Sequence, residues 1–116
     1  MTRADALREL IERVEAGKTA LSLKDTIHVA QTIGASEWIV PAFDGSLDAV
    51  ARLEAPLRGR GWLVYCHERV DRWKSCLWQP EPHAEAAATA PTEARARLLA
   101  VLKAMLHEEE NGHDPA

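Results

Sequence analysis

The chain has 116 residues, an apolar fraction of 47% and a formal net charge of −4. This length predicts one domain with one core, which we place at residues 1–107. No apolar run approaches the roughly 20 residues of a membrane-spanning helix, so we expect no membrane association. The start, MTRADALREL, has no signal-peptide core. We therefore expect a cytoplasmic protein.

The acidic excess lies at the C-terminus. Four of the 18 acidic residues fall within residues 108–116, and the other 14 equal the 14 basic residues in number. We expect a neutral folded body followed by an acidic, disordered tail over 108–116. A neutral body lacks the dense basic face of a general nucleic-acid-binding protein, so this class is not expected.

Two amphipathic helices are predicted in the first third of the chain. Residues 4–16 carry apolar side chains at helical spacing, and Gly17 follows as a stop. The expected buried face of this helix holds Leu7, Leu10, Ile11 and Val14. A second helix is expected from Ser22, where SLKD has the spacing of a capping box, to Gly34.

A connector and a third helix are predicted next. Residues 35–43, ASEWIVPAF, are interpreted as a connector because Pro41 interrupts regular structure. An Asp-Gly turn then precedes Ser46, whose hydroxyl suits the N-cap of a helix that Pro56 helps to end.

Residues 62–67 and 72–79 predict an antiparallel hairpin. Both are rich in aromatic and β-branched side chains, and the turn ERVD separates them. An even-numbered turn pairs His67 with Arg72. Alternation then defines an apolar face of Trp62, Val64, Cys66, Trp73, Ser75 and Leu77. The mixed apolar and basic second face carries Leu63, Tyr65, His67, Arg72, Lys74, Cys76 and Trp78. The two cysteines therefore lie on opposite faces, which prevents a disulfide between them.

The end of the chain completes the predicted fold. Residues 84–90, AEAAATA, are either a short third strand or extended chain. Thr92 is the expected N-cap of a long last helix with apolar residues at helical spacing. The fold class is then α/β of the α+β type. A small antiparallel sheet, formed by the hairpin with or without a third strand, is sandwiched between helices in α-β-α layers.

This order of elements is similar to the phage ABA sandwich domain family, small phage and prophage proteins of unknown function. The residues that carry the likeness are PAFDGSLDAV (41–50), Gly61-Trp62, SCLWQP (75–80) and TAPTEARARLLAVLKAML (89–106). It covers roughly residues 38–106, and Phe43 stands where Tyr is expected. The resemblance implies an α-β-α fold and an infected or lysogenic bacterial host. It implies no activity and no catalytic residues.

Catalytic and metal sites are not expected. Cys66 and His67 are neighbours on a strand and point to opposite faces, and no local feature activates Cys76. The five histidines show no HxH or HxxxH spacing. Asp48, which could pair with Asp44 in acid–base chemistry, is explained by a favourable interaction with the helix dipole. We therefore expect a non-enzymatic protein with no cofactor and no metal.

Four tryptophans are many for so small a core. Packing in the core explains them, since large aromatics dominate small cores. The alternative is a recognition surface, for which Trp, Tyr and Arg are frequent anchors. The candidate binding residues on the second sheet face are Tyr65, Arg72, Lys74 and Trp78. They suit the acidic edge of a partner protein, or the base and phosphate of a small anionic nucleotide.

The predicted function is therefore binding. We expect a phage or prophage accessory protein that binds a host protein or protein complex and inhibits antiviral defence, as an anti-CRISPR protein does. One alternative is a sponge that sequesters a cyclic-nucleotide immune signal in a basic, aromatic pocket. A second alternative is a virion or morphogenesis component. The last helix is a candidate homodimer interface.

Overall fold

The computed structural model describes residues 2–16, 31, 36–80 and 83–111 of the chain. The described elements are α1 (Arg3–Glu15), α3 (Ser36–Phe43), α4 (Leu47–Gly59), β1 (Leu63–Glu68), β2 (Trp73–Pro80), β3 (His83–Ala90) and α5 (Glu93–Glu110). The helix expected from Ser22 to Gly34 lies outside the described residues, apart from Gln31. No helix in the described ranges is long and apolar enough to cross a membrane.

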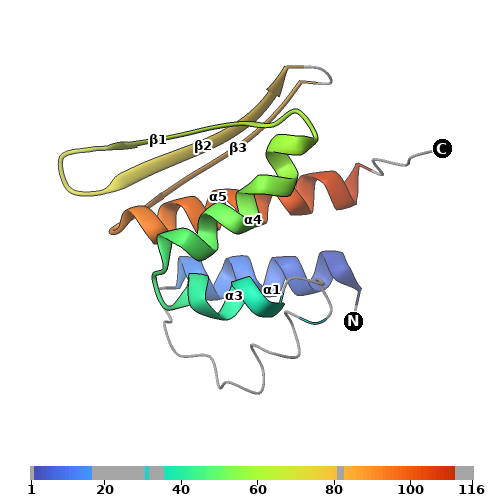
Figure 1. Cartoon of the computed structure of the whole chain (residues 1–116), viewed down its shortest axis with the longest axis horizontal. Helices are drawn as coiled ribbons and strands as arrows, with labels where there is room; N and C mark the ends of the chain where they lie inside the picture. The colour runs from blue at the N-terminus through green and yellow to red at the C-terminus, as the bar shows by residue number, and fades with distance from the viewer. Residues whose placement is uncertain (1, 17–30, 32–35, 81–82, 112–116) are drawn as a thin grey trace.

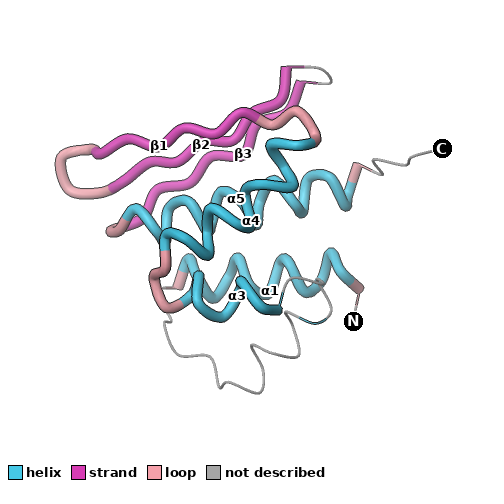
Figure 2. The backbone as a smooth tube through the Cα atoms, in the orientation of Figure 1, coloured by secondary structure: helices cyan, strands magenta, loops and turns pink. Residues whose placement is uncertain are grey.

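The helices and the sheet form stacked layers (Figure 1). Three strands pair antiparallel in the order β1-β2-β3. Helix α5 packs against β2 and β3, and it also contacts α1 and α4. These contacts confirm the α+β class, with helices that flank a small antiparallel sheet. The order of layers differs from the expected α-β-α sandwich, because the described helices lie on one side of the sheet (Figure 2).

The third strand is present. Residues of β3 pair with β2 from Trp73↔Ala90 to Pro80↔His83, which confirms the strand interpretation of residues 84–90. Burial alternates along β3, and the buried members are Ala84, Ala86, Ala88 and Ala90. Helix α5 buries alanines of its own, which are Ala94, Ala96, Ala100 and Ala104. Small side chains in both elements let the helix pack closely against the sheet.

The predicted hairpin register is wrong, although the predicted faces are right. His67 pairs with Lys74, not with Arg72. Strand β1 continues to Glu68, so the turn comprises residues 69–72 and is closed by a hydrogen bond from Arg69 N to Arg72 O at 2.6 Å. Because the register differs by two residues, the side chains that remain in the two strands keep their predicted faces, whereas Arg72 falls in the turn.

Two predicted N-caps are confirmed. Ser46 Oγ accepts a hydrogen bond from Ala49 N, and Thr92 Oγ1 accepts one from Arg95 N, each at 3.2 Å. These hydroxyls satisfy backbone N–H groups that a helix leaves free in its first turn. Gly45, just before the first cap, has φ +95, a conformation that glycine adopts without steric cost.

Both prolines that were expected to interrupt helices lie inside them. Pro41 is within α3, so the predicted connector is wrong, and Pro56 is within α4, which continues to Gly59. Packing accounts for both cases, since Ile39 beside Pro41 and Leu57 beside Pro56 are fully buried. Burial of such side chains offsets the hydrogen bond that a proline removes from a helix.

The acidic tail is helical where it begins. Helix α5 extends to Glu110, so the expected disorder is wrong for residues 108–110. Three ion pairs hold this end of the helix, with N–O distances of 2.7, 3.1 and 2.8 Å: Arg60–Glu108, Arg3–Glu109 and Arg8–Glu110. Residues 112–116 lie outside the described residues.

Candidate functional site

The first candidate surface is the face of the sheet that points away from α5, here called the outer face. Alternation along the strands places eleven side chains on it: Leu63, Tyr65, His67, Lys74, Cys76, Trp78, Pro80, His83, Glu85, Ala87 and Thr89. In the described part of the chain, no helix lies over this face (Figure 1). Leu63 and Tyr65 are each 49% exposed. Both lie on the edge strand β1, and exposed apolar side chains on an open sheet face are a typical feature of an interaction surface.

Aromatic and basic groups are ordered along the outer face. Trp78 lies opposite Leu63 at one end, and Lys74 lies opposite His67 at the other. The rings of Tyr65 and His67 stack with centroids 5.7 Å apart and an interplanar angle of 7°. This arrangement holds the phenol ring against its neighbour on the same strand. Ordered aromatic side chains lose little conformational entropy on binding, which favours their use as anchors.

Three of the four predicted binding residues share this face. Tyr65, Lys74 and Trp78 lie on it, whereas Arg72 lies in the hairpin turn. The guanidinium of Arg72 is half exposed, and its Nε is 3.4 Å from the carboxylate of Asp71. Arg72 was placed on the sheet by the incorrect register. It therefore flanks the outer face at its basic end and does not form part of it.

Trp73 pairs with Ala90 on the inner face of the sheet, and two further tryptophans also have structural positions. Trp62 is 1% exposed and belongs to the core. Trp38 is half-buried, and the guanidinium carbon of Arg52 lies 4.5 Å from the centroid of its ring. Core packing and a cation–π contact account for these two residues. Trp78 is left as the tryptophan of the outer face.

Both cysteines are free thiols. Cys66 is half-buried on the inner face, and Cys76 is buried on the outer face beside Glu85, with an Sγ–Oε1 distance of 3.7 Å. Burial raises the pKa of each thiol, and the charge of Glu85 raises the pKa of Cys76 further. At neutral pH both are therefore protonated and weakly nucleophilic.

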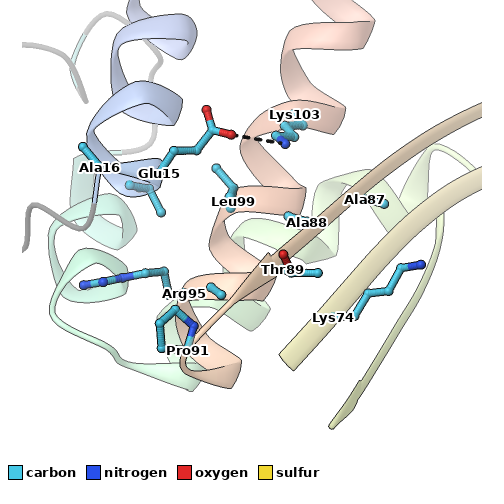
Figure 3. A pocket seen from close by; sticks show the side chains of 12 residues that line it. Glu15, Ala16, Lys74, Ala87, Ala88, Thr89, Pro91, Arg95, Leu99 and Lys103 are labelled. Carbon is cyan, nitrogen blue, oxygen red and sulfur yellow. Dashed lines mark ion pairs between the residues drawn. The ribbon is translucent and has the colours of Figure 1, made fainter. Parts of the chain in front are cut away.

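The second candidate surface is a cavity of about 480 Å³ between β3, α5 and the end of α1. Its charged lining residues are Glu15, Lys74, Arg95 and Lys103. Its apolar lining residues are Val14, Ala87, Ala88, Ala90, Pro91 and Leu99. Figure 3 shows Lys103 and Glu15 facing each other at one end, Arg95 on α5 and Lys74 across β3. The Lys103 Nζ to Glu15 Oε2 distance is 3.7 Å.

Sequence analysis did not identify this cavity. The signal that could have indicated it is the spacing of Arg95, Leu99 and Lys103, which are four residues apart and so share one stripe of α5. The stripe alone does not place Glu15 or Lys74 nearby, because those contacts join residues far apart in the chain.

A buried ion pair between α4 and α5 was also not predicted. Glu54 is fully buried, and Arg97 donates to both of its carboxylate oxygens, from Nε at 3.1 Å and from Nη2. Arg97 also contacts Glu93 at 3.1 Å. The hydrogen bond to Glu54 raises the pKa of Arg97. This pair fixes how the two helices pack, and its burial leaves it no surface for a ligand.

Comparison with family models, with curated proteins and with solved structures finds no match to this chain.

Proposed function

We propose that this chain is a non-enzymatic phage or prophage accessory protein that binds a host protein and inhibits bacterial antiviral defence. The observation that supports binding most directly is the open outer face, where Leu63 and Tyr65 are each 49% exposed beside Trp78. The phage setting rests on the sequence resemblance. The outer face would bury these exposed apolar side chains against the partner.

The charge of the outer face indicates the kind of partner. His67 and Lys74 occupy one end, and Arg69 and Arg72 lie in the turn beyond it. Basic groups beside exposed apolar side chains fit a protein surface with an acidic edge, because complementary charge steers encounter and fixes orientation. We therefore propose that the partner is a defence protein whose bound edge is acidic.

The test is phage infection of a bacterial strain that carries a defined CRISPR–Cas system. The chain is expressed in these cells, and the number of plaques reports how far it protects the phage. In parallel, the purified Cas complex is assayed for target-DNA cleavage with and without the protein. Replacing Leu63 and Tyr65 by Ser is expected to lower protection at least about tenfold, because a few large anchors carry most of an interface's energy.

The matched control is Leu47→Ser on α4. Leu47 is 42% exposed, close to the exposure of Leu63, but it lies away from the outer face. The Leu47→Ser variant is expected to protect the phage as well as the unchanged chain does. If the double variant Leu63→Ser/Tyr65→Ser protected the phage as well as the unchanged chain does, the outer face would be excluded as the binding surface.

The cyclic-nucleotide sponge is the alternative function. The described cavity supplies the basic groups that this function requires, but its described lining residues include no aromatic side chain to stack on a base. Binding of a cyclic dinucleotide that is lost in Lys74→Gln, with no effect on a Cas complex, would favour the sponge.

A further inference from the structure

The cavity between β3, α5 and α1 has the size of a small-molecule site. Its volume of about 480 Å³ lies within the roughly 300–1,000 Å³ typical of ligand pockets. Leu63 and Tyr65 do not line it, although Lys74, Ala87 and Thr89 belong both to its lining and to the outer face. The inference drawn from it goes beyond the proposed function and does not depend on it.

The charges around this cavity favour an anion. Three cationic side chains line it, those of Lys74, Arg95 and Lys103, against the single carboxylate of Glu15. A concave site lined by an excess of one charge concentrates ligands of the opposite charge. Arg and Lys are also the side chains that bind phosphate groups best.

The contact between Lys103 and Glu15 is weak enough to be displaced. The two atoms are 3.7 Å apart, and the side chains are 34% and 50% exposed. A pair with this exposure adds little to stability. An anion that binds the ammonium group more strongly can therefore displace the Glu15 carboxylate at little cost in stability.

The uncharged lining residues indicate the chemistry of the ligand beyond its anionic group. Ala88, Ala90 and Leu99 provide an apolar wall of small extent. The described lining has no aromatic ring for a nucleobase. We propose that this cavity binds a small organic phosphate monoester, with its phosphate at the Lys103 ammonium group in place of the Glu15 carboxylate and its short apolar part against Leu99 and the alanines.

The experiment is a titration of the full ¹⁵N-labelled chain, followed by two-dimensional NMR, with butyl phosphate, inorganic phosphate and 1-butanol. Butyl phosphate is expected to shift the amide signals of residues 87–90 and 99–103. It should bind at least about fivefold more tightly than inorganic phosphate, since burial of its alkyl chain adds free energy. Butanol should shift these signals little. Equal binding of butyl phosphate and inorganic phosphate, or of butyl phosphate and butanol, would overturn the proposal.

Two substitutions test the roles of Lys103 and Glu15, and they are expected to change the affinity in opposite directions. Lys103→Gln is expected to weaken butyl phosphate binding about fivefold, and Glu15→Gln to strengthen it about twofold, because an exposed charge contact is worth about that much. Arg69→Gln in the hairpin turn makes the same change in net charge away from the cavity and should leave the affinity unchanged. If Arg69→Gln lowered the affinity for butyl phosphate as much as Lys103→Gln does, the attraction would be non-specific and the proposed site would be refuted. Because Glu15→Gln is expected to gain affinity, its result cannot be confused with loss of folding.

Discussion

The indole Nε1 of Trp62 donates a hydrogen bond to Oε2 of Glu108 at 3.0 Å. This bond joins the start of the sheet to the last turns of α5. Arg60 binds the same carboxylate through Nε at 2.9 Å and Nη2 at 2.7 Å, and His107 packs edge-on against the indole. Since Trp62 is 1% exposed, its N–H has little access to water. The first acidic residue of the tail therefore completes the core.

Replacing Glu108 by Ala is expected to lower the free energy of unfolding by about 2 kcal/mol. The change leaves the buried indole N–H without its acceptor, and unsatisfied buried donors cost about 1–3 kcal/mol. Urea unfolding followed by circular dichroism measures the loss.

The control for this prediction is Glu110→Ala. Its ion pair with Arg8 has both side chains 47% exposed, so a loss below about 1 kcal/mol is expected. Equal losses for the two variants would contradict the structural role of Glu108. Deletion of residues 108–116 would remove this support as well, so it cannot serve as a clean test of partner binding.

Local signals were sufficient to predict the helix starts and the faces of the hairpin. The hydroxyls of Ser46 and Thr92 act on backbone groups three residues away, and alternation of side chains holds whatever the register. The same alternation brought Tyr65, Lys74 and Trp78 together on one face.

The features that could not be predicted depend on contacts between distant residues. The helical state of residues 108–110 follows from partners at positions 3, 8 and 60. Tertiary burial of Ile39 likewise keeps Pro41 inside a helix. The cavity unites α1, β2, β3 and α5, which no spacing within one element reveals.

Replacing Arg97 by Met is expected to lower the free energy of unfolding by about 3 kcal/mol. The substitution leaves Glu54, which is fully buried, without its main partner, and an uncompensated buried charge costs about 3–5 kcal/mol. Urea unfolding at pH 7 measures the loss.

The double variant Glu54→Met/Arg97→Met separates charge from packing. It is expected to recover most of the lost stability, because replacing a buried ion pair by apolar side chains is often neutral. If the double variant is as unstable as Arg97→Met alone, shape complementarity and not the unpaired carboxylate explains the loss.

Replacing Ala86 by Leu is expected to lower the free energy of unfolding by about 2 kcal/mol. Ala86 is 5% exposed and lies on the face of β3 that α5 covers, and added methylenes in a packed core cost about 1–3 kcal/mol. Ala87→Leu is the control, since its neighbouring side chain points to the outer face. It should change stability by less than about 0.5 kcal/mol. Thermal unfolding of both variants distinguishes the faces, and a larger loss for Ala87→Leu would reverse their assignment.

The two thiols predict a loss of stability at alkaline pH. Burial raises the pKa of Cys66 and Cys76 above the ordinary value of 9.0, so the folded chain holds these protons more tightly than the unfolded chain does. Between the two pKa values the folded state binds more protons, and the free energy of unfolding therefore falls as pH rises. Below the unfolded pKa the thiols contribute no pH dependence.

Urea unfolding at pH 7 and pH 9.5 tests this sign. Other groups also titrate in this range, so the comparison is with Cys66→Ala/Cys76→Ala. The unchanged chain is expected to lose more stability between the two pH values than the double variant loses, because only the unchanged chain must ionise buried thiols. An equal loss in both proteins would mean that the thiols ionise as easily in the folded chain as in the unfolded one, which the burial of Cys76 at 4% exposure opposes.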